Sequence, residues 1–215
     1  MPEIRSIHDL VIGYRLPMKE PPDHRLLQTR LDTPLGAMLA IASGRGLCLL
    51  EFVQRRALQC EVTDLQRLFD TAVVPGVSEH LTSAGTQLCE YFEGTRTTFA
   101  VPIDAPGSPF QRSVWTQLQR IPFGETVSYA EMASELDRPG AQRAVGRANG
   151  HNRIAIIIPC HRVVRSDGRP GGYGGGLWRK RWLLHHEQTV LAGRELAPVG
   201  LWNDRSGNLL ETTSR

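Results

Sequence analysis

The chain has 215 residues, of which 40% are hydrophobic and 22% charged, with a formal net charge of +3. These values are ordinary for a globular protein of one or two domains. No apolar run approaches the roughly 20 residues that a bilayer requires, and charges interrupt the N-terminus where a signal peptide would be apolar. We therefore expect a cytoplasmic protein with no membrane attachment. The four cysteines lack CxxC spacing, which fits a reducing compartment and argues against a zinc site; they are Cys48, Cys60, Cys89 and Cys160.

The first half of the chain predicts an α+β domain. Residues 1–25 form an irregular, proline-containing lead, and alternating or turn-bounded patterns then predict strands at 26–31, 37–42 and 47–52. Helical spacing of apolar residues follows at 60–69 and 77–92, with a further strand expected at 97–103. We place this domain at residues 26–103. A linker rich in Pro, Asp, Ala and Gly follows over 102–109.

The second domain, residues 108–188, is predicted to be mostly helical, with a tail over 189–215. Ser108 and Pro109 form a helix start, because serine caps an N-terminus and proline suits the first turn. Two short helices at 128–136 and 141–149, joined by a glycine-containing turn, predict a helix-turn-helix. Ser128 and Glu131 make a capping box for the first of them.

The second helix of this pair carries small residues and two arginines one turn apart, Arg143 and Arg147. A helix that reads the major groove usually presents longer polar side chains to the bases. Small residues allow a close backbone approach, which suits the minor groove, and Arg143 can then enter the base stack as a wedge. A tightly packed core helix is the alternative interpretation.

Charge is distributed unevenly along this domain. Between Arg138 and Trp182 there are ten basic residues and one acid, Asp167. Such a local excess favours a polyanion as partner, although a solvated basic face without a partner has the same composition.

A reactive-cysteine motif lies in the same segment. Residues 156–158 predict a buried strand that stops at Pro159, so that Cys160 is held rigidly at the floor of a pocket. His161 and the later Glu187 provide a means of ionising the thiol, and we expect a thiolate, which is the nucleophilic form of cysteine. A buried packing cysteine is the alternative.

A glycine-rich run over residues 168–176 follows the cysteine and lacks the Lys-Ser/Thr of a phosphate-binding loop. We interpret it as a flexible wall that closes over a flat ligand, with Tyr173 as an aromatic face. An atom inside duplex DNA is reached only after its nucleotide is rotated out of the stack. The sequence thus favours a flipped base facing Cys160, with Arg143 in the vacated space.

Taken together, these motifs resemble the O6-alkylguanine-DNA alkyltransferases, and the bacterial forms most. The resemblance covers residues 110–187 and rests on the motifs Gly-Glu-Thr-Val-Ser-Tyr at 124–129, Arg-Ala-Val-Gly at 143–146, Pro-Cys-His-Arg-Val at 159–163, Tyr-Gly-Gly-Gly at 173–176 and Leu-Leu-His-His-Glu at 183–187, together with Asn152. Residues 26–99 resemble the family's RNase H-like domain more loosely. The resemblance implies an RNase H-like domain followed by a winged-helix-like helix-turn-helix domain.

The family's activity implies repair of alkylated guanine in double-stranded DNA by one irreversible transfer to Cys160. His161 would take the thiol proton through a water, Glu187 would orient the imidazole, and Asn152 would brace the turn. Tyr129 would reach guanine N3. The carbonyls of Cys160 and Val163 would receive the guanine amine. Further expected contacts with DNA or the pocket are Ala130, Arg138, Arg143, Ser166, Tyr173 and Gly174.

The resemblance also implies a stand-alone monomer without metal or cofactor, since the zinc ligands of some animal members are not evident here. Gly174 stands where some relatives have serine, which we expect to widen the pocket slightly. The main alternative is an alkyltransferase-like protein that binds the lesion without transfer, but such proteins carry tryptophan at the position of Cys160. A helix-turn-helix transcription factor and a cysteine hydrolase are further alternatives.

Overall fold

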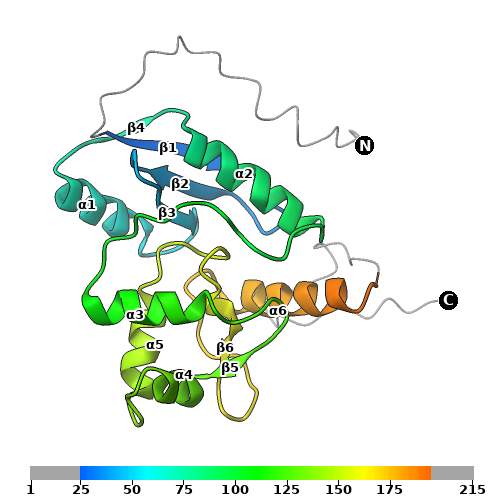
Figure 1. Ribbon diagram of the computed structural model, residues 1–215. Helices are drawn as coiled ribbons and strands as arrows, with labels where there is room; N and C mark the ends of the chain where they lie inside the picture. The colour runs from blue at the N-terminus through cyan, green and yellow to red at the C-terminus, as the bar shows by residue number, and fades with distance from the viewer. Residues whose placement is uncertain (1–24, 195–215) are drawn as a thin grey trace.

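The computed structural model describes residues 25–194 (Figure 1). The lead predicted for residues 1–25 therefore lies outside the described residues except for residue 25, and of the predicted tail only residues 189–194 are described. The domain boundaries stay predictions. The described chain has an N-terminal sheet with two helices and a C-terminal, mostly helical part (Figure 1), which matches the predicted α+β class.

The N-terminal sheet contains four strands in the order β3-β2-β1-β4. Strands β1 (Leu26–Leu31), β2 (Met38–Ala42) and β3 (Leu47–Phe52) form an antiparallel meander, while β4 (Val73–Pro75) pairs with β1 in parallel. Helices α1 (Leu58–Phe69) and α2 (Glu79–Phe92) follow β3 and β4. The three meander strands and both helices lie where the sequence patterns predict them, to within two residues.

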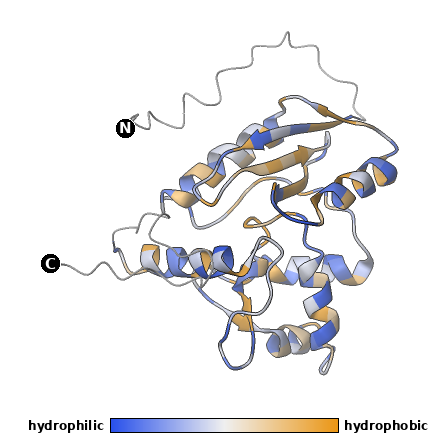
Figure 2. Cartoon of the chain, turned by 180° about the vertical axis from the view of Figure 1, so that it is seen from behind, coloured by the Kyte–Doolittle hydropathy of each residue, from blue (hydrophilic) through white to orange (hydrophobic). Residues whose placement is uncertain are grey.

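Both faces of this sheet are covered, which explains why all six residues of β3 are buried. Met38 and Phe52 belong to the large core that includes Leu88 of α2, whereas Ile41 belongs to a smaller core with Leu65 of α1. Successive strand residues point to opposite faces, so one strand supplies both cores. Hydrophobic and hydrophilic residues both occur on each of these helices (Figure 2), as packing on one face requires.

Two strand predictions differ from the structure. The strand predicted at 97–103 is absent, and only a single bridge joins Ile103 to Leu47. Conversely, β4 was not predicted, because it is three residues long and ends at a proline. Its existence depends on pairing with β1 rather than on a local pattern.

The C-terminal part is built from short helices around a two-stranded parallel pair. Helix α3 (Pro109–Leu118) begins at the predicted Ser108 cap, and α4 (Tyr129–Glu135) and α5 (Gln142–Gly150) form the predicted helix-turn-helix. The Ser128–Glu131 capping box is present. Strands β5 (Val127–Ser128) and β6 (Val163–Val164) pair in parallel, and α6 (Leu177–Leu191) closes the described chain. Within residues 25–194 no helix has the length and apolarity to span a bilayer.

The buried strand predicted at residues 156–158 is wrong. These residues form turns, Ile156 adopts a positive φ of 73°, and Cys160 begins a 3-10 turn, η2 (Cys160–Arg162). The Asn152 side chain explains the departure, because it donates to the carbonyls of Ile154 and Ile158 and accepts from the Ile154 amide. Backbone groups bonded in this way are not available to a strand ladder.

Candidate active site

Cys160 lies at the first position of η2, and the side chains of two asparagines form hydrogen bonds with the backbone around it. Asn152 binds the backbone before the turn, at 2.9 Å from the Ile158 carbonyl, and is itself 1% exposed. Asn149 at the end of α5 donates to the Cys160 carbonyl at 3.3 Å. The cysteine is 6% exposed. The backbone that carries the sulfur is thus fixed by side chains on both sides.

His161 forms a fully buried pair with Glu187 of α6. Its Nε2 lies 2.7 Å from Glu187 Oε1, and both side chains have no exposed surface. A carboxylate only accepts, so this contact assigns the proton to Nε2 and leaves the lone pair on Nδ1. Nδ1 is buried and has no hydrogen-bond partner among the described residues. Burial lowers the pKa of His161 in spite of Glu187, so the ring is neutral and can accept a proton.

Glu187 is surrounded by donors from three other parts of the chain. Besides His161 it accepts from the Tyr91 hydroxyl at 2.9 Å, from Nε and Nη2 of Arg162 at 3.0 Å each, and from the Gly124 amide at 2.9 Å. Burial by itself would raise the pKa of Glu187, but His161 and Arg162 outweigh it and hold the pKa far below its usual range. The carboxylate is therefore charged at neutral pH.

The sulfur itself is not ionised at rest, contrary to the expectation from sequence. Burial raises the pKa of Cys160 to about 11, and Glu51 raises it further, while Asn152, Lys180 and Arg55 lower it. At neutral pH the site therefore holds a thiol beside a neutral imidazole. A thiolate forms only if the proton is removed during the reaction.

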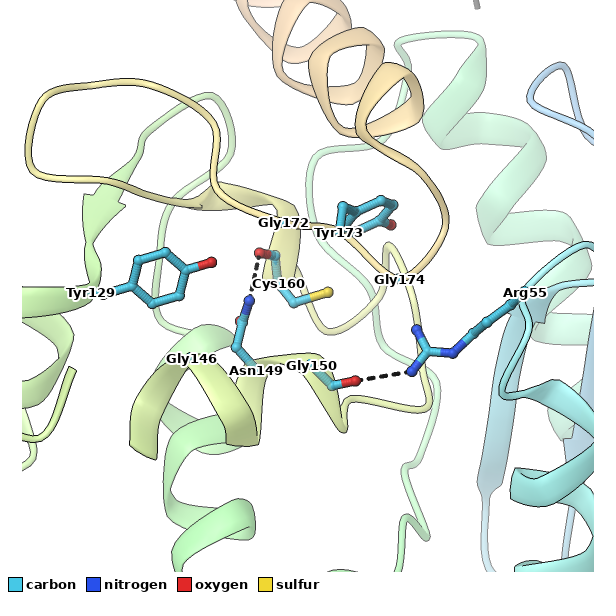
Figure 3. A pocket seen from close by; sticks show the side chains of 9 residues that line it. All are labelled: Arg55, Tyr129, Gly146, Asn149, Gly150, Cys160, Gly172, Tyr173 and Gly174. Carbon is cyan, nitrogen blue, oxygen red and sulfur yellow. Dashed lines mark hydrogen bonds between the residues drawn. The ribbon is translucent and has the colours of Figure 1, made fainter. Parts of the chain in front are cut away.

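A cavity of about 220 Å³ opens above Cys160 (Figure 3). Tyr129 lies on one side of the sulfur, and Tyr173 and Arg55 lie on the other (Figure 3). Its lining residues come from both parts of the fold and are Arg55, Tyr129, Gly146, Asn149, Gly150, Cys160, Gly172, Tyr173 and Gly174.

Four of the predicted site residues line this cavity, namely Tyr129, Cys160, Tyr173 and Gly174. Two others do not. Ser166 is exposed and lies outside the lining. Val163 is buried, and its carbonyl accepts from Nζ of Lys180 at 2.5 Å.

The predicted DNA contacts lie on the helix-turn-helix. Arg143 is exposed in the first turn of α5, and Ala130 is half-buried in α4. Arg138, in the turn between them, is exposed and stacks over the Phe110 ring at 5.5 Å. Helix α5 also reaches the cavity, because Gly146 lies against the Tyr129 ring. One helix therefore presents an arginine to the solvent and a glycine to the pocket.

Comparison with known proteins decides the family. The ribonuclease-like domain of 6-O-methylguanine DNA methyltransferase matches residues 26–105, and the DNA binding domain of the same family matches residues 109–189. The chain belongs to this methyltransferase family. The resemblance predicted from the cysteine and glycine motifs is thereby confirmed, and so is the RNase H-like character of the N-terminal domain.

Individual relatives agree with this assignment. A methylated-DNA–protein-cysteine methyltransferase of Shigella flexneri is 38% identical over 174 residues, which are 78% of this chain and 98% of the relative. A protein of the same name from Mycolicibacterium paratuberculosis is 57% identical over 102 residues, or 47% of this chain, and the match spans only 62% of that relative. The crystal structure of Mycobacterium tuberculosis OGT in complex with DNA is 40% identical and superimposes with a TM-score of 0.65, covering 77% of this chain and 94% of that one.

Several site residues of this family member were not assigned from its sequence. Asn149 stands three residues before Asn152, and this proximity to an assigned residue was a usable signal. Tyr91 and Arg55 belong to the N-terminal domain, far from the cysteine motif, and only the fold brings them to the site. Gly174 was expected to widen the pocket, but this is wrong, because a Cβ at Gly174 would overlap Nη1 of Arg55. The arginine occupies the space that the glycine leaves.

Proposed function

We propose that this chain repairs DNA by transferring the alkyl group from O6 of guanine in duplex DNA to Cys160, in one irreversible event per molecule. The observation that carries the proposal is Cys160 at the base of a cavity between two tyrosines, beside the buried His161–Glu187 pair. An acceptor thiol, a base and a space for a flat ring are the parts that this reaction needs.

In the proposed chemistry the nucleophile and the proton acceptor are both residues of this chain. The Cys160 proton passes through a bridging water to Nδ1 of His161, and Glu187 stabilises the imidazolium that forms. The sulfur then attacks the alkyl carbon, so that an S–C bond forms as the C–O6 bond breaks. Guanine leaves with the electron pair of that bond and takes up a proton. The product is S-alkylcysteine, a stable thioether, so each molecule is proposed to react once.

The substrate base is proposed to lie against Tyr129, whose hydroxyl faces guanine N3 and aids departure of the base. Burial raises the pKa of this hydroxyl, and proximity to Cys160 adds to the effect, so it remains a donor at neutral pH. The carbonyls of Cys160 and Val163 are proposed acceptors for the guanine amine. The Val163 carbonyl accepts from Lys180 and keeps a second lone pair. The Cys160 carbonyl already accepts from the Val163 amide and from Asn149 at 3.3 Å, so the guanine amine is proposed to take the place of Asn149 there.

Mass spectrometry tests the transfer directly. The protein is incubated with duplex DNA bearing O6-methylguanine, and the expected product is one methyl group in place of the thiol hydrogen on the Cys160 peptide. Peptides containing Cys48, Cys60 and Cys89 should stay unmodified, and Cys160→Ser should bind the duplex without accepting the methyl group. Turnover beyond one equivalent would point to a hydrolase. Binding without any transfer by the unaltered protein would point to a lesion-binding protein.

Arg143 is proposed to fill the gap that the flipped nucleotide leaves. Its exposed position in the first turn of α5, on the helix that also reaches the cavity, supports this role. We expect Arg143→Ala to slow repair of duplex DNA far more than reaction with free O6-benzylguanine. Arg147→Ala on the same helix is the matched control, because Arg147 is also exposed but lies one turn away. Equal losses on duplex and free base would mean that Arg143 is structural.

Ala130, Arg138 and Ser166 are proposed as further DNA contacts, since each is partly or fully exposed. We also infer that the protein acts as a monomer in the cytoplasm on DNA that carries alkylated guanine. Sedimentation of the free protein and of its complex with a short duplex tests the first part of this inference. A stable dimer in the absence of DNA would contradict it.

A further inference from the structure

Arg55 is a cavity residue that comes from the N-terminal domain. It follows β3, and its Nη2 crosses to the C-terminal domain and donates to the carbonyl of Gly150 at 2.9 Å. Gly150 ends α5 and itself lines the cavity. The site above Cys160 is therefore closed on one side by a side chain from the other domain.

Two glutamate side chains, Glu51 and Glu61, fix this guanidinium in place. Nη1 lies 3.1 Å from Glu51 Oε1 and Nη2 lies 2.8 Å from Glu61 Oε1, while the Arg55 side chain is only 8% exposed. Glu51 is 2% exposed and Glu61 is 7% exposed. A planar guanidinium held by two acids and a carbonyl has little freedom to move aside, unlike an arginine at the surface.

Arg55 lies where the alkyl group of a bound substrate would extend. In Figure 3, Tyr129 and Arg55 lie on opposite sides of Cys160, and the sulfur points toward the side of Arg55. If the base lies against Tyr129, the substituent on O6 extends past the sulfur toward Arg55 and Gly174. The space beside Gly174 is already taken by Nη1 of Arg55.

We propose that Arg55 is a specificity-determining residue, whose guanidinium forms the far wall of the alkyl pocket and limits the size of the group that is transferred. This inference rests on the proposed function. It assigns to the N-terminal domain a direct part in substrate choice. Small alkyl groups fit between the sulfur and the guanidinium, whereas bulky groups meet a fixed, charged wall.

The charge of Arg55 also affects the pKa of Cys160, and this effect is separate from the space that the side chain occupies. Arg55 and Lys180 are the cations whose charge lowers the pKa of Cys160, against the effects of burial and Glu51. Loss of the charge slows transfer of every alkyl group alike. Loss of the wall changes the ratio between large and small groups, so the ratio is the quantity to measure.

Two duplexes of one sequence, carrying either O6-methylguanine or O6-benzylguanine, measure this ratio through the rate of Cys160 alkylation. Arg55→Ala is expected to raise the benzyl-to-methyl ratio by about tenfold or more, since single methylene groups in a pocket change selectivity by at least that factor. Arg55→Lys keeps a charge near Glu51 and Glu61 and shortens the wall, so the ratio should rise in the same direction. Arg56→Ala, at the exposed neighbouring position, should leave the ratio unchanged.

Arg55→Ala leaves Glu51 and Glu61 without their cation, and the variant may be made with Glu51→Gln to limit the loss of folding. Unchanged ratios in folded Arg55→Ala/Glu51→Gln and Arg55→Lys would overturn the inference. The unaltered protein separates the two proposals. If it does not transfer methyl at all, the proposed function fails; if it transfers methyl and the ratio does not respond to Arg55, only the specificity role fails.

Discussion

Two tyrosines with buried hydroxyl groups, Tyr91 and Tyr173, provide a controlled test of the hydrogen bonds at the site. The Tyr91 hydroxyl donates to Glu187 at 2.9 Å, whereas the buried Tyr173 hydroxyl has no partner among the described residues. Replacing each tyrosine by phenylalanine removes one oxygen and keeps the ring. The Tyr91 ring retains its contacts with Phe92, Phe99, Phe123 and His186. The two variants therefore differ in whether a hydrogen bond is lost.

The expected cost follows from what remains around Glu187. A hydrogen bond to a charged group contributes about 1.5–3 kcal/mol to the free energy of unfolding. Oε1 keeps two other donors after Tyr91→Phe, His161 at 2.7 Å and Arg162 at 3.0 Å, so we expect the lower end, about 1.5 kcal/mol. For a chain of this size that corresponds to a fall in Tm of roughly 3–6 °C. Tyr173→Phe should be neutral or slightly stabilising, because no bond is broken.

Urea unfolding followed by circular dichroism measures both changes. Glu187→Gln provides the upper reference, because it leaves the buried Arg162 charge uncompensated and should cost about 3–5 kcal/mol. Equal losses in the two phenylalanine variants would refute the reasoning, since the hydrogen bond would then not account for the difference. A loss in Tyr91→Phe as large as that in Glu187→Gln would refute it as well, because Glu187 keeps its charge and its other donors.

Two further predictions concern pH and helix capping. The unfolded chain binds a proton on His161 and on His186 below the ordinary value of 6.5, and on Glu187 below 4.5, while burial or ion pairing lowers all three pKa values in the fold. Glu51 opposes this trend above pH 4.5, because burial raises its pKa to about 8 and the fold then holds a proton that the unfolded chain has lost. The unfolding free energy should thus decline moderately as pH falls from 6.5 to 4.5 and more steeply below 4.5, where Glu51 no longer opposes and Glu187 contributes, by up to about 1.4 kcal/mol per pH unit for each proton; a slope that does not steepen below pH 4.5 would contradict this. Ser128→Ala should cost about 1 kcal/mol by removing the cap of α4, and Ser128→Thr should restore much of it; equal thermal melts of both variants would exclude a capping role.

Features that depend on a few neighbouring residues were predictable from the sequence. The Ser108 and Ser128 caps, the meander strands and the helix-turn-helix all follow from side-chain chemistry within one or two turns of the chain. The pairing of His161 with Glu187 was also expected, although only through the family resemblance. The features that were not predicted depend on contacts beyond the local sequence pattern. Strand β4 exists through its partner β1, and the turn before Cys160 depends on how one asparagine uses both ends of its amide.

The same distinction applies to the site. Its motif residues lie in short runs between residues 124 and 187 and were assigned from them. Tyr91 and Arg55, in contrast, have no local pattern that separates them from other buried or surface residues. Tyr91 reaches Glu187 across 96 positions of the chain, and Arg55 reaches Gly150 across 95. Contacts of this range are set by how the two domains pack. The C-terminal motifs alone therefore predict Cys160 and the His161–Glu187 pair. The N-terminal domain adds Tyr91, which donates to Glu187, and Arg55, which lines the pocket.

The neutral state of Cys160 has a physical advantage for the proposed reaction, in which the protein is consumed in a single transfer. A permanently ionised thiol would react with any small electrophile, since the thiolate is the nucleophilic form. Burial keeps the pKa of Cys160 near 11. The charges of Lys180 and Arg55 would stabilise a thiolate, and the free lone pair on Nδ1 of His161 would accept the proton. A base that fills the cavity brings an alkyl carbon to the sulfur, and the proton then needs to move only as the new bond forms. In the proposed reaction, selectivity would thus arise because the thiol becomes a strong nucleophile only when a substrate occupies the pocket.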